Sequence, residues 1–414
     1  MTGIDTGDTA FMLLCAALVL FMTPGLAFFY GGLVRSKNVV NTMMMSFVAM
    51  GIVAVQWVLY GYSFAFGTGG GIFGSIFGSF QWLGLHGVAL SPNPDYSPTI
   101  PHQLFMIYQA MFAIITPALI SGAVVERMKF KAYAVFILLW STLSYDVVAH
   151  WVWGTGGWLR SMGALDFAGG TVVHINAGVA ALVASLVLGP RKDFPHRSSP
   201  PHNVTLALLG AGMLWFGWFG FNAGSALGSS ALATVAFVST NTAAASGMLG
   251  WLMLDLFLKG KPTAVGAITG AVAGLVAITP ACGFVTPLGA VAIGLSVSGV
   301  CYWALNQRMK WNLDDTLDAF SVHGVGGIFG ALATGILATR SVNPAGNDGL
   351  LQGNPSLFFT QCLAVAATIA YSALVTFGLL KLIDLTIGIR SDDESQHEGL
   401  DLVEHGEKGY HELA

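Results

Sequence analysis

The chain has 414 residues, of which 54% are hydrophobic and only 9% are charged. A soluble domain carries roughly 25% charged residues, so this composition excludes a soluble multi-domain enzyme and predicts a polytopic membrane protein. The near balance of 21 acidic and 17 basic residues argues against a nucleic-acid-binding protein, and the four scattered cysteines, with no CxxC pair, fit neither a disulfide framework nor a zinc site.

Long apolar segments recur along the chain. A helix needs roughly 20 apolar residues to cross the hydrocarbon core of a membrane. Eleven segments approach this length, which predicts an all-α polytopic membrane protein with eleven transmembrane helices. The segments are 9–33, 41–66, 101–125, 132–151, 165–189, 203–226, 232–258, 263–279, 285–306, 316–338 and 354–386.

The basic residues predict the orientation of these spans. If the eleven spans alternate, fifteen of the 17 Lys and Arg residues fall on one side, and only Arg160 and Arg340 fall on the other. Because positive charge concentrates in cytoplasmic loops, we expect the N-terminus outside and the tail from about residue 388 in the cytoplasm.

Aromatic residues mark the outer ends of the third and fourth spans. Tyr108 and Phe112 are four residues apart and share a helix face, and Trp153 follows the fourth span in AHWVWGTGG. Aromatic faces stabilise a cation by roughly 0.5–2 kcal/mol, so these rings are candidates for a cation site. The alternative is an interfacial aromatic belt. At the inner end of the third span, the adjacent Glu126 and Arg127 predict an interfacial ion pair.

The fifth span opens with Asp166 and carries His174 about ten residues further in. Ionisable residues inside a span are costly, so each is a functional candidate. Asp166 either caps this helix or attracts a nearby cation, and capping is the favoured interpretation. Near the outer end of the sixth span, Phe221 and Ser225 again share a face, and a serine hydroxyl can accept a hydrogen bond from a bound cation.

The tenth span places Asp318 at its start, where we expect a helix cap, and His323 further in. Spans five and ten run in opposite directions, so His174 and His323 should lie at nearly the same depth. Inverted repeats of five helices would make these spans equivalent. We expect the two imidazoles to hydrogen-bond each other and to line one path; the alternative is that each bonds only a neighbouring helix.

Signs of catalysis are lacking in the sequence. Neither histidine has a Cys, Asp or second His at i+3 or i+4, so we expect no metal site. No Ser–His–acid arrangement appears, and the G-x-G-x-x-G at 69–74 follows a membrane helix instead of a strand. We therefore expect a conduit that is not an enzyme and uses no cofactor. Because no basic residue lies deep in a span, this conduit should contain no fixed cation.

Long strings of the sequence resemble the ammonium transporter (Amt/Mep/Rh) family, in its bacterial and archaeal Amt branch. Six strings and a tail string carry the resemblance in order. They are TPGLAFFYGGLVRSKN (23–38), YQAMFAIITPALISGAVVERMKF (108–130), AHWVWGTGGWLRSMGALDFAGGTVVHINAG (149–178), GWFGFNAGSA (217–226), GWLMLDLFLKGKPTAVGAITGAVAGLVAITPACG (250–283), DAFSVHGVGGIFGALATGI (318–336) and EGLDLVEHGEKGY (398–410).

The resemblance implies a transmembrane domain over 1–389, with an inverted five-plus-five repeat and a long eleventh helix, and a cytoplasmic regulatory tail over 390–414. It implies a homotrimer in the lipid of the cytoplasmic membrane, which is the inner membrane of a cell that has two, and a PII-type signal protein as partner. The substrate would be ammonium or ammonia. An ammonium sensor and a neutral-gas channel for ammonia or carbon dioxide remain the alternatives.

The resemblance also assigns roles to the candidate residues. Trp153, Phe112 and Ser225 would bind ammonium outside, with Tyr108 beside them at a position that is often phenylalanine in the family. Asp166 would support binding and deprotonation. The remaining roles are a gate formed by Phe112 and Phe221 and a pore lined by His174 and His323.

Overall fold

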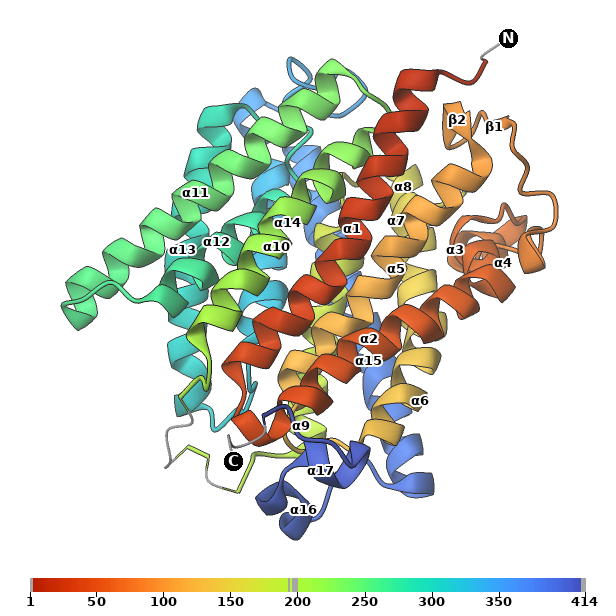
Figure 1. Ribbon diagram of the computed structural model, residues 1–414. Coiled ribbons are helices and arrows are strands. Elements are labelled where there is room, and N and C mark those ends of the chain that lie inside the picture. Colours follow the sequence, from red (N-terminus) through yellow and green to blue (C-terminus); the bar gives the residue numbers. More distant parts are fainter. Residues whose placement is uncertain (1–2, 193, 196–199, 411–414) are drawn as a thin grey trace.

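The computed structural model describes residues 3–192, 194–195 and 200–410. It is mostly helical, and its helices run beside one another from the face that carries the N-terminus to the face that carries the C-terminal helices (Figure 1). We call these the N-terminal face and the C-terminal face. The α-helices are α1 (Thr6–Leu33), α2 (Val39–Gln56), α3 (Tyr62–Phe66), α4 (Gly71–Ile76), α5 (His102–Val124), α6 (Phe130–Trp140), α7 (Asp146–Trp153), α8 (Trp158–Ser161), α9 (Asn176–Leu188), α10 (Val204–Ala223), α11 (Ala231–Lys259), α12 (Ala264–Ile278), α13 (Pro287–Lys310), α14 (Val325–Leu337), α15 (Pro355–Ile387), α16 (Asp393–Glu398) and α17 (Leu400–His405).

Shorter elements interrupt or join these helices. Four π-helical turns lie within spans. Such a turn contains about one residue more than an α-helical turn and is therefore wider. π-Helical turns are frequent at functional sites. The four turns are η2 (Trp57–Gly61), η4 (Ser141–Tyr145), η5 (Gly170–Ile175) and η7 (Phe320–Gly324). The 3₁₀ turns are η1 (Ser36–Asn38), η3 (Leu83–Leu85), η6 (Gly224–Ala226) and η8 (Leu350–Gln352), and β1 (Pro92–Asn93) pairs antiparallel with β2 (Ser97–Pro101).

Helices occupy the positions of all eleven predicted spans. Among the described residues, ten continuous helical stretches are long and apolar enough to cross a membrane. The remaining predicted span, 263–279, corresponds to α12, which has 15 residues and is therefore about 22 Å long. This length falls short of the roughly 30 Å hydrocarbon core, so eleven full spans remain a prediction.

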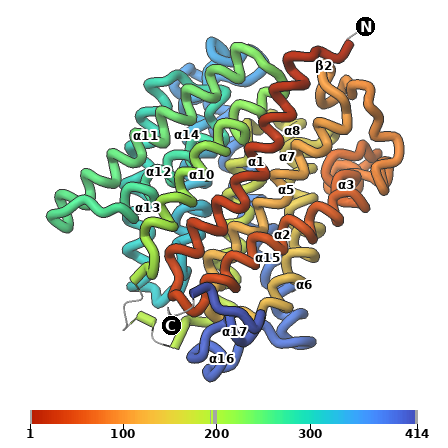
Figure 2. The backbone as a smooth tube through the Cα atoms, viewed as in Figure 1, coloured from red at the N-terminus to blue at the C-terminus, as the bar shows by residue number. Residues whose placement is uncertain are grey.

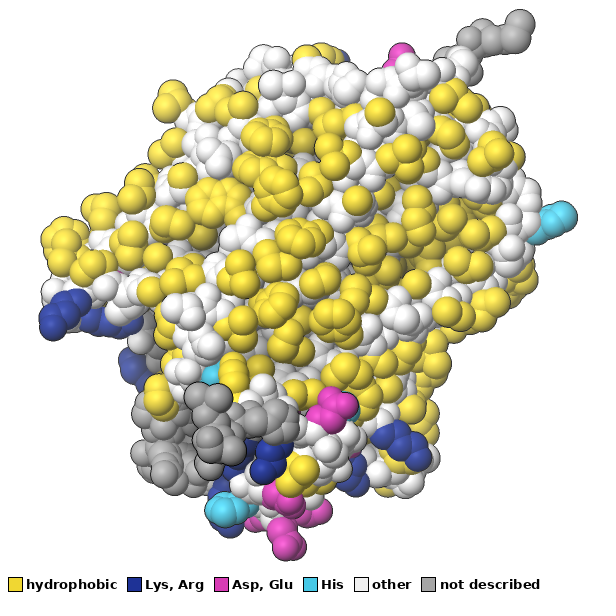
Figure 3. Space-filling view, viewed as in Figure 1, with side chains coloured by type: hydrophobic (Ala, Val, Ile, Leu, Met, Phe, Trp, Pro, Cys, Tyr) yellow, Lys and Arg dark blue, Asp and Glu magenta, His cyan; other side chains and the backbone are white. Residues whose placement is uncertain are grey.

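The outer surface of the helices is apolar. Hydrophobic side chains cover most of the flank seen in Figure 3, and Lys, Arg, Asp and Glu gather mainly toward the C-terminal face. Large exposed side chains such as Leu385 at 86% and Phe257 at 76% would be costly in water. Such a surface suits the interior of a lipid bilayer, where the backbone groups are satisfied within the helices.

Glycines let the central helices approach closely. A Cβ on Gly210 of α10 would lie 2.2 Å from the backbone nitrogen of Phe29 in α1. A Cβ on Gly178 of α9 would lie 2.1 Å from the backbone nitrogen of Gly324 in η7. Small residues at these crossings allow backbone contact, as is common between membrane helices. The second crossing brings together the two helices that carry the predicted histidines.

The end of the chain lies against the C-terminal face. Helix α17 packs against the start of α2 and α16 packs against α17, at the end of the molecule opposite to the N-terminus (Figure 2). Asp401 Oδ1 accepts a hydrogen bond from the backbone of Asn41 at 2.8 Å, and Asn38 Oδ1 accepts one from the backbone of Leu400 at 2.9 Å. The segment that the sequence predicts to be a tail is therefore docked on the helical body in this structure.

Candidate functional site

A cavity of about 180 Å³ opens at the N-terminal face, and we call it the N-side cavity. Phe112 of α5, Trp153 at the end of α7 and Ser225 of η6 all line it, so three of the predicted cation-site residues meet here. Gln109, one position beyond Tyr108 on α5, lines the same cavity, and its side-chain oxygen has no hydrogen-bond partner among the described residues. The cavity thus combines aromatic faces with oxygen acceptors, which suits a cation that carries N–H groups.

Tyr108 lies behind this cavity wall. Its side chain is fully buried, and its hydroxyl donates to the carbonyl oxygens of Gly220 at 3.0 Å and Phe221 at 2.9 Å. The same hydroxyl lies 3.3 Å from Ser225 Oγ. Tyr108 is not among the residues that line the N-side cavity. Its hydroxyl therefore holds the end of α10 and Ser225 in position.

Two phenyl rings, packed against each other with their planes tilted by 31°, form the floor of the N-side cavity. The ring centroids of Phe112 and Phe221 are 4.1 Å apart, and both side chains are about 1% exposed. Phe112 lines the N-side cavity, whereas Phe221 lines a second, central cavity. The pair therefore separates the two cavities and must move before anything passes between them.

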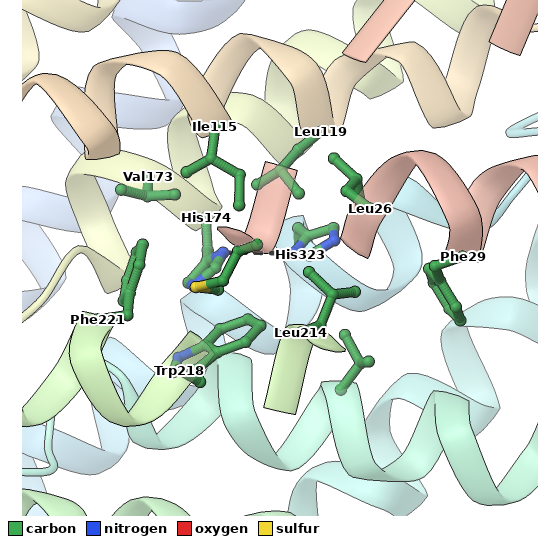
Figure 4. Close-up of a pocket in the computed structure, with 12 residues that line it drawn as sticks. Leu26, Phe29, Ile115, Leu119, Val173, His174, Leu214, Trp218, Phe221 and His323 are labelled. Carbon is green, nitrogen blue, oxygen red and sulfur yellow. Dashed lines mark hydrogen bonds between the residues drawn. The ribbon is translucent and has the colours of Figure 1, made fainter. Parts of the chain in front are cut away.

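The central cavity contains both predicted histidines. His174 Nδ1 lies 3.3 Å from His323 Nδ1, so the structure confirms the expected contact between the imidazoles (Figure 4). Trp218 of α10 stacks on His174 with centroids 5.4 Å apart. The cavity has a volume of about 10 Å³ and is otherwise lined by apolar side chains such as Leu119 and Leu214. A volume of this size holds about one water-sized molecule.

A third cavity, of about 200 Å³, lies between the histidines and the C-terminal face, and we call it the C-side cavity. His323 lines both this cavity and the central one. The three cavities thus form a series that is divided first by the phenylalanine pair and then by His323. Such a series is suited to the passage of one small molecule at a time.

An aspartate holds the start of each histidine-bearing turn. The carboxylate of Asp166 accepts four backbone hydrogen bonds of 2.6–3.0 Å from residues 169–172, at the start of η5. The carboxylate of Asp315 accepts three, of 2.8–3.3 Å, from residues 319–321, at the start of η7. Each aspartate precedes its histidine by eight residues. Asp166 therefore acts as a helix cap, as the sequence predicts.

The prediction that Asp318 caps the tenth span is wrong. Its side chain accepts none of the backbone hydrogen bonds at that helix start; Asp315 accepts them. Asp318 instead forms an ion pair with Arg308 Nε at 2.6 Å. Asp318 itself adopts the left-handed backbone region, with φ +60°. The resulting turn lies between Asp315 and the helix and directs the Asp318 side chain away from the helix start.

The predicted ion pair between Glu126 and Arg127 does not form. Glu126 pairs with Arg35 at 2.9 Å and with Arg191 at 2.7 Å, whereas Arg127 donates to Thr316 Oγ1 and to the carbonyl of Asp314. Burial alone would raise the pKa of Glu126, but Arg191 and Arg35 outweigh this effect and leave the pKa below its ordinary value. Glu126 adopts φ +69°, so the chain turns and the two neighbours point to different partners.

The expectation of a conduit without a fixed cation is also wrong. Arg160 lines the N-side cavity, where it donates to the carbonyl of Trp153 at 2.5 Å and lies 5.9 Å from the ring centroid of Tyr96. Asp95 lines the same cavity and partly balances this charge. The sequence places Arg160 outside the predicted spans, and the structure places it in the short helix α8, whose position at the cavity wall is a tertiary feature.

Several residues of the site were missed by the sequence analysis. Trp218 could have been found, because it lies three positions before Phe221 and therefore shares its helix face. Gln109, Asp315 and Arg160 show no such local signal. The indole nitrogen of Trp153 also donates to the carbonyl of Asp166 at 2.9 Å, which ties the mouth of the site to the cap of the histidine turn.

Comparisons with known proteins agree with this architecture. The sequence profile described as Ammonium Transporter Family matches residues 10–410. The chain is 53% identical over 405 residues to an ammonium transporter of Bacillus subtilis and 50% identical over 410 residues to one of Aquifex aeolicus, with coverage of 98% of this chain in both and 98% and 94% of those proteins. The crystal structure of Saccharomyces cerevisiae Mep2 matches with a TM-score of 0.88 and 35% identity, over 95% of this chain and 89% of that one. A structure titled "Sensor Amt Protein" matches with a TM-score of 0.88 and 31% identity, over 96% and 98% of the two chains.

Proposed function

The chain belongs to the ammonium transporter family, and from this premise we propose that it binds ammonium at the N-side cavity and passes ammonia and the proton separately through the central cavity. The single observation that carries this proposal is the series of three cavities, with a contacting histidine pair at the centre. A bare ammonium ion would lose several kcal/mol or more of solvation in a dry, apolar space of this size.

In this proposal ammonium is recruited by aromatic faces and oxygen acceptors. Trp153 and Phe112 supply the faces, and their ring centroids are 5.9 Å apart at an interplanar angle of 89°. Ser225 and Gln109 supply oxygen atoms that accept N–H hydrogen bonds. Metal cations cannot donate hydrogen bonds, so such a site selects ammonium over potassium.

The ion then yields its proton, and neutral ammonia passes the Phe112–Phe221 gate. Ammonia can hydrogen-bond to His174 and His323, and the proton follows over the same imidazoles, so that uptake is electrogenic. His174 Nε2 is buried and has no hydrogen-bond partner among the described residues, so it is free to meet the transported molecule. Asp166 supports this path by holding the turn that carries His174.

We further propose that the N-terminal face is extracellular and that the protein is a homotrimer in the cytoplasmic membrane. The docked segment 390–410, at the C-terminal face, would be the regulatory tail, and a PII-type signal protein would bind at that face. The charge asymmetry of the sequence supports the orientation.

Current measured on purified protein in liposomes tests the proposal. A pulse of ammonium should give a saturable inward current, and an equal pulse of potassium should give none. Ammonia-dependent alkalinisation without current would favour a neutral-gas channel. A flat response from folded protein would favour a sensor, a candidate that the likeness to the structure titled "Sensor Amt Protein" keeps open.

Tyr108 offers a first matched test within the mouth. Because its hydroxyl bonds backbone carbonyls and does not face the cavity, Tyr108→Phe should lower the stability by about 1 kcal/mol. The half-saturating ammonium concentration should change less than about threefold. Thermal unfolding and current titration measure the two effects. A loss of affinity of tenfold or more would place the hydroxyl in direct contact with ammonium.

Arg160 offers a second test, of electrostatics at the mouth. Arg160→Gln removes a positive charge from the wall of the N-side cavity, so ammonium should bind about threefold more tightly at low ionic strength. The gain should shrink in 0.15 M salt, where the screening length is about 8 Å. Asp95→Asn is the matched control and should change the affinity in the opposite direction. An unchanged affinity at low salt in both variants would contradict the electrostatic interpretation.

A further inference from the structure

A groove of about 560 Å³ opens on the apolar flank of the molecule, and we call it the flank groove. It lies between α2 and α6, which pack against each other (Figure 1). Leu138 of α6 forms one wall, and residues of α2 and η2 form the rest. Val55 and Leu59 in this wall are 60% and 55% exposed, and a Cβ on Gly51 would meet no atom within 4 Å. The groove is therefore open to the lipid that surrounds the helices.

Two polar side chains line the flank groove, and each offers it a hydrogen-bond acceptor. Gln56 is 2% exposed; its Nε2 donates to Asp146 Oδ2 at 2.7 Å, and its Oε1 has no partner among the described residues. The hydroxyl of Tyr60 lies 3.3 Å from Thr142 Oγ1. Because Thr142 gives its one proton to the carbonyl of Leu138 at 2.9 Å, Tyr60 is the donor in this contact, and its oxygen can still accept. A molecule that fits this groove must therefore supply a donor.

The depth of the groove indicates a lipid from one leaflet. The helical stretch Ser36–Phe66 has 31 residues and is about 46 Å long, so it exceeds the roughly 30 Å hydrocarbon core by about 8 Å at each end. Tyr60 is about 9 Å from Phe66 along the helix and thus lies near the edge of this core. From Tyr60 the groove extends about 18 Å to Val48, which is close to the roughly 15 Å depth of one leaflet. This extent suits an acyl chain.

Charge restricts the head of such a lipid. Among the described residues, no Lys or Arg lines the flank groove, and the carboxyl group of Asp146 lies directly behind Gln56. A phosphate group would meet no cation here and would be repelled by an ionised carboxylate. An uncharged hydroxyl group needs no cation, and a lipid without a charged headgroup can move in as far as the amide oxygen of Gln56.

We propose that the flank groove binds an uncharged, hydroxyl-bearing lipid of the diacylglycerol type, from the leaflet at the N-terminal face. Its hydroxyl group donates to Gln56 Oε1, with the oxygen of Tyr60 as a second acceptor nearer the membrane surface. One acyl chain lies over Gly51 toward the middle of the bilayer. The inference goes beyond the proposed function and does not rest on it, because the groove shares no lining residue with the three cavities.

Native mass spectrometry of the full-length protein in detergent tests the hydrogen bond, with dioleoylglycerol as the probe. Its 3-O-methyl ether has the same chains and no hydroxyl donor, so the wild type should bind dioleoylglycerol about fivefold more tightly than the ether. The double variant Gln56→Leu/Asp146→Leu removes the acceptor without leaving a buried carboxyl group unpaired, and the preference should fall below about twofold. Equal binding of the two lipids to the wild type would overturn the inference.

The shape of the groove gives a second criterion. Gly51→Leu fills the groove without striking another atom, so the protein should fold normally and bind dioleoylglycerol about tenfold more weakly. Gly299→Leu on α13 is the matched control, because this glycine is also exposed and has no atom within 4 Å of its Cβ position; it should bind like the wild type. Unchanged binding in Gly51→Leu would overturn the inference.

Two other occupants of the groove are distinguished by the same experiment. Tighter binding of dioleoylphosphatidylglycerol than of dioleoylglycerol, lost in Gly51→Leu, would mean that the groove takes an anionic lipid and would overturn the uncharged class. A changed subunit number in Gly51→Leu, with no dioleoylglycerol bound to the wild type, would mean that a second copy of the chain covers the groove. Transport is not measured in any of these arms, so their failure leaves the proposed function standing.

Discussion

Alanine in place of His174 or of His323 is expected to lower the ammonium-driven current roughly tenfold or more. Each substitution removes one of the two imidazoles that contact each other at 3.3 Å in the central cavity. The remaining imidazole has no partner with which to share a proton, and ammonia loses one of its two hydrogen-bonding groups in an apolar space. The measurement is current on a supported membrane during an ammonium pulse.

The control for this experiment is His86→Ala. His86 lies in the loop between α4 and β1 at the N-terminal face and is exposed, so its loss should leave the current unchanged. A potassium pulse checks selectivity in every variant, because an enlarged and wetter cavity admits other ions. The proposed mechanism fails if both pore variants keep an unchanged, ammonium-selective current.

Asp166→Ala is expected to be the most destabilising of the substitutions considered. It leaves four buried backbone N–H groups of residues 169–172 without their acceptor, at a cost on the order of 3 kcal/mol. The loss should also loosen Trp153, whose indole donates to the carbonyl of Asp166, so ammonium binding and current should fall together. Thermal unfolding in detergent and current titration measure these effects.

Three further variants separate capping from other roles of the aspartates. Asp166→Asn retains one acceptor oxygen and should show an intermediate loss of stability. Asp315→Ala should resemble Asp166→Ala because it caps the second histidine turn. Asp318→Ala should destabilise much less, since its carboxylate accepts no backbone hydrogen bond. Equal unfolding temperatures for the Asp315 and Asp318 variants would contradict the assignment of caps.

The local properties of the chain made much of the fold predictable. All eleven predicted spans correspond to helices, because a lipid environment requires long apolar segments whose backbone groups are satisfied within the helix. His174 and His323 were found for the same reason: an ionisable residue is costly at that depth and stands out in an apolar span. The aromatic residues of the mouth were found because positions four apart share a helix face.

The misassigned residues lie where distant segments meet. Glu126 bonds Arg35 and Arg191 instead of its neighbour Arg127, and the short helix α8 brings Arg160 to the wall of the N-side cavity. The sequence also predicts a cap at Asp318, although the aspartate that precedes its histidine by eight residues, as Asp166 does, is Asp315. For Glu126 the local pattern favours the adjacent arginine, whereas the fold supplies two arginines from distant segments.

The sequence by itself therefore determined the helices, their apolar surface and the identity of the two central histidines, because each depends on the solvent that a segment meets. Only the tertiary structure decided how these parts form a path. The contact of His174 with His323 depends on a backbone crossing at Gly178 and Gly324, where a single Cβ would lie 2.1 Å from the opposite chain. The division into three cavities likewise depends on how rings from α5 and α10 pack against each other. These contacts join helices that are far apart in the sequence, so the periodicity within one helix cannot predict them.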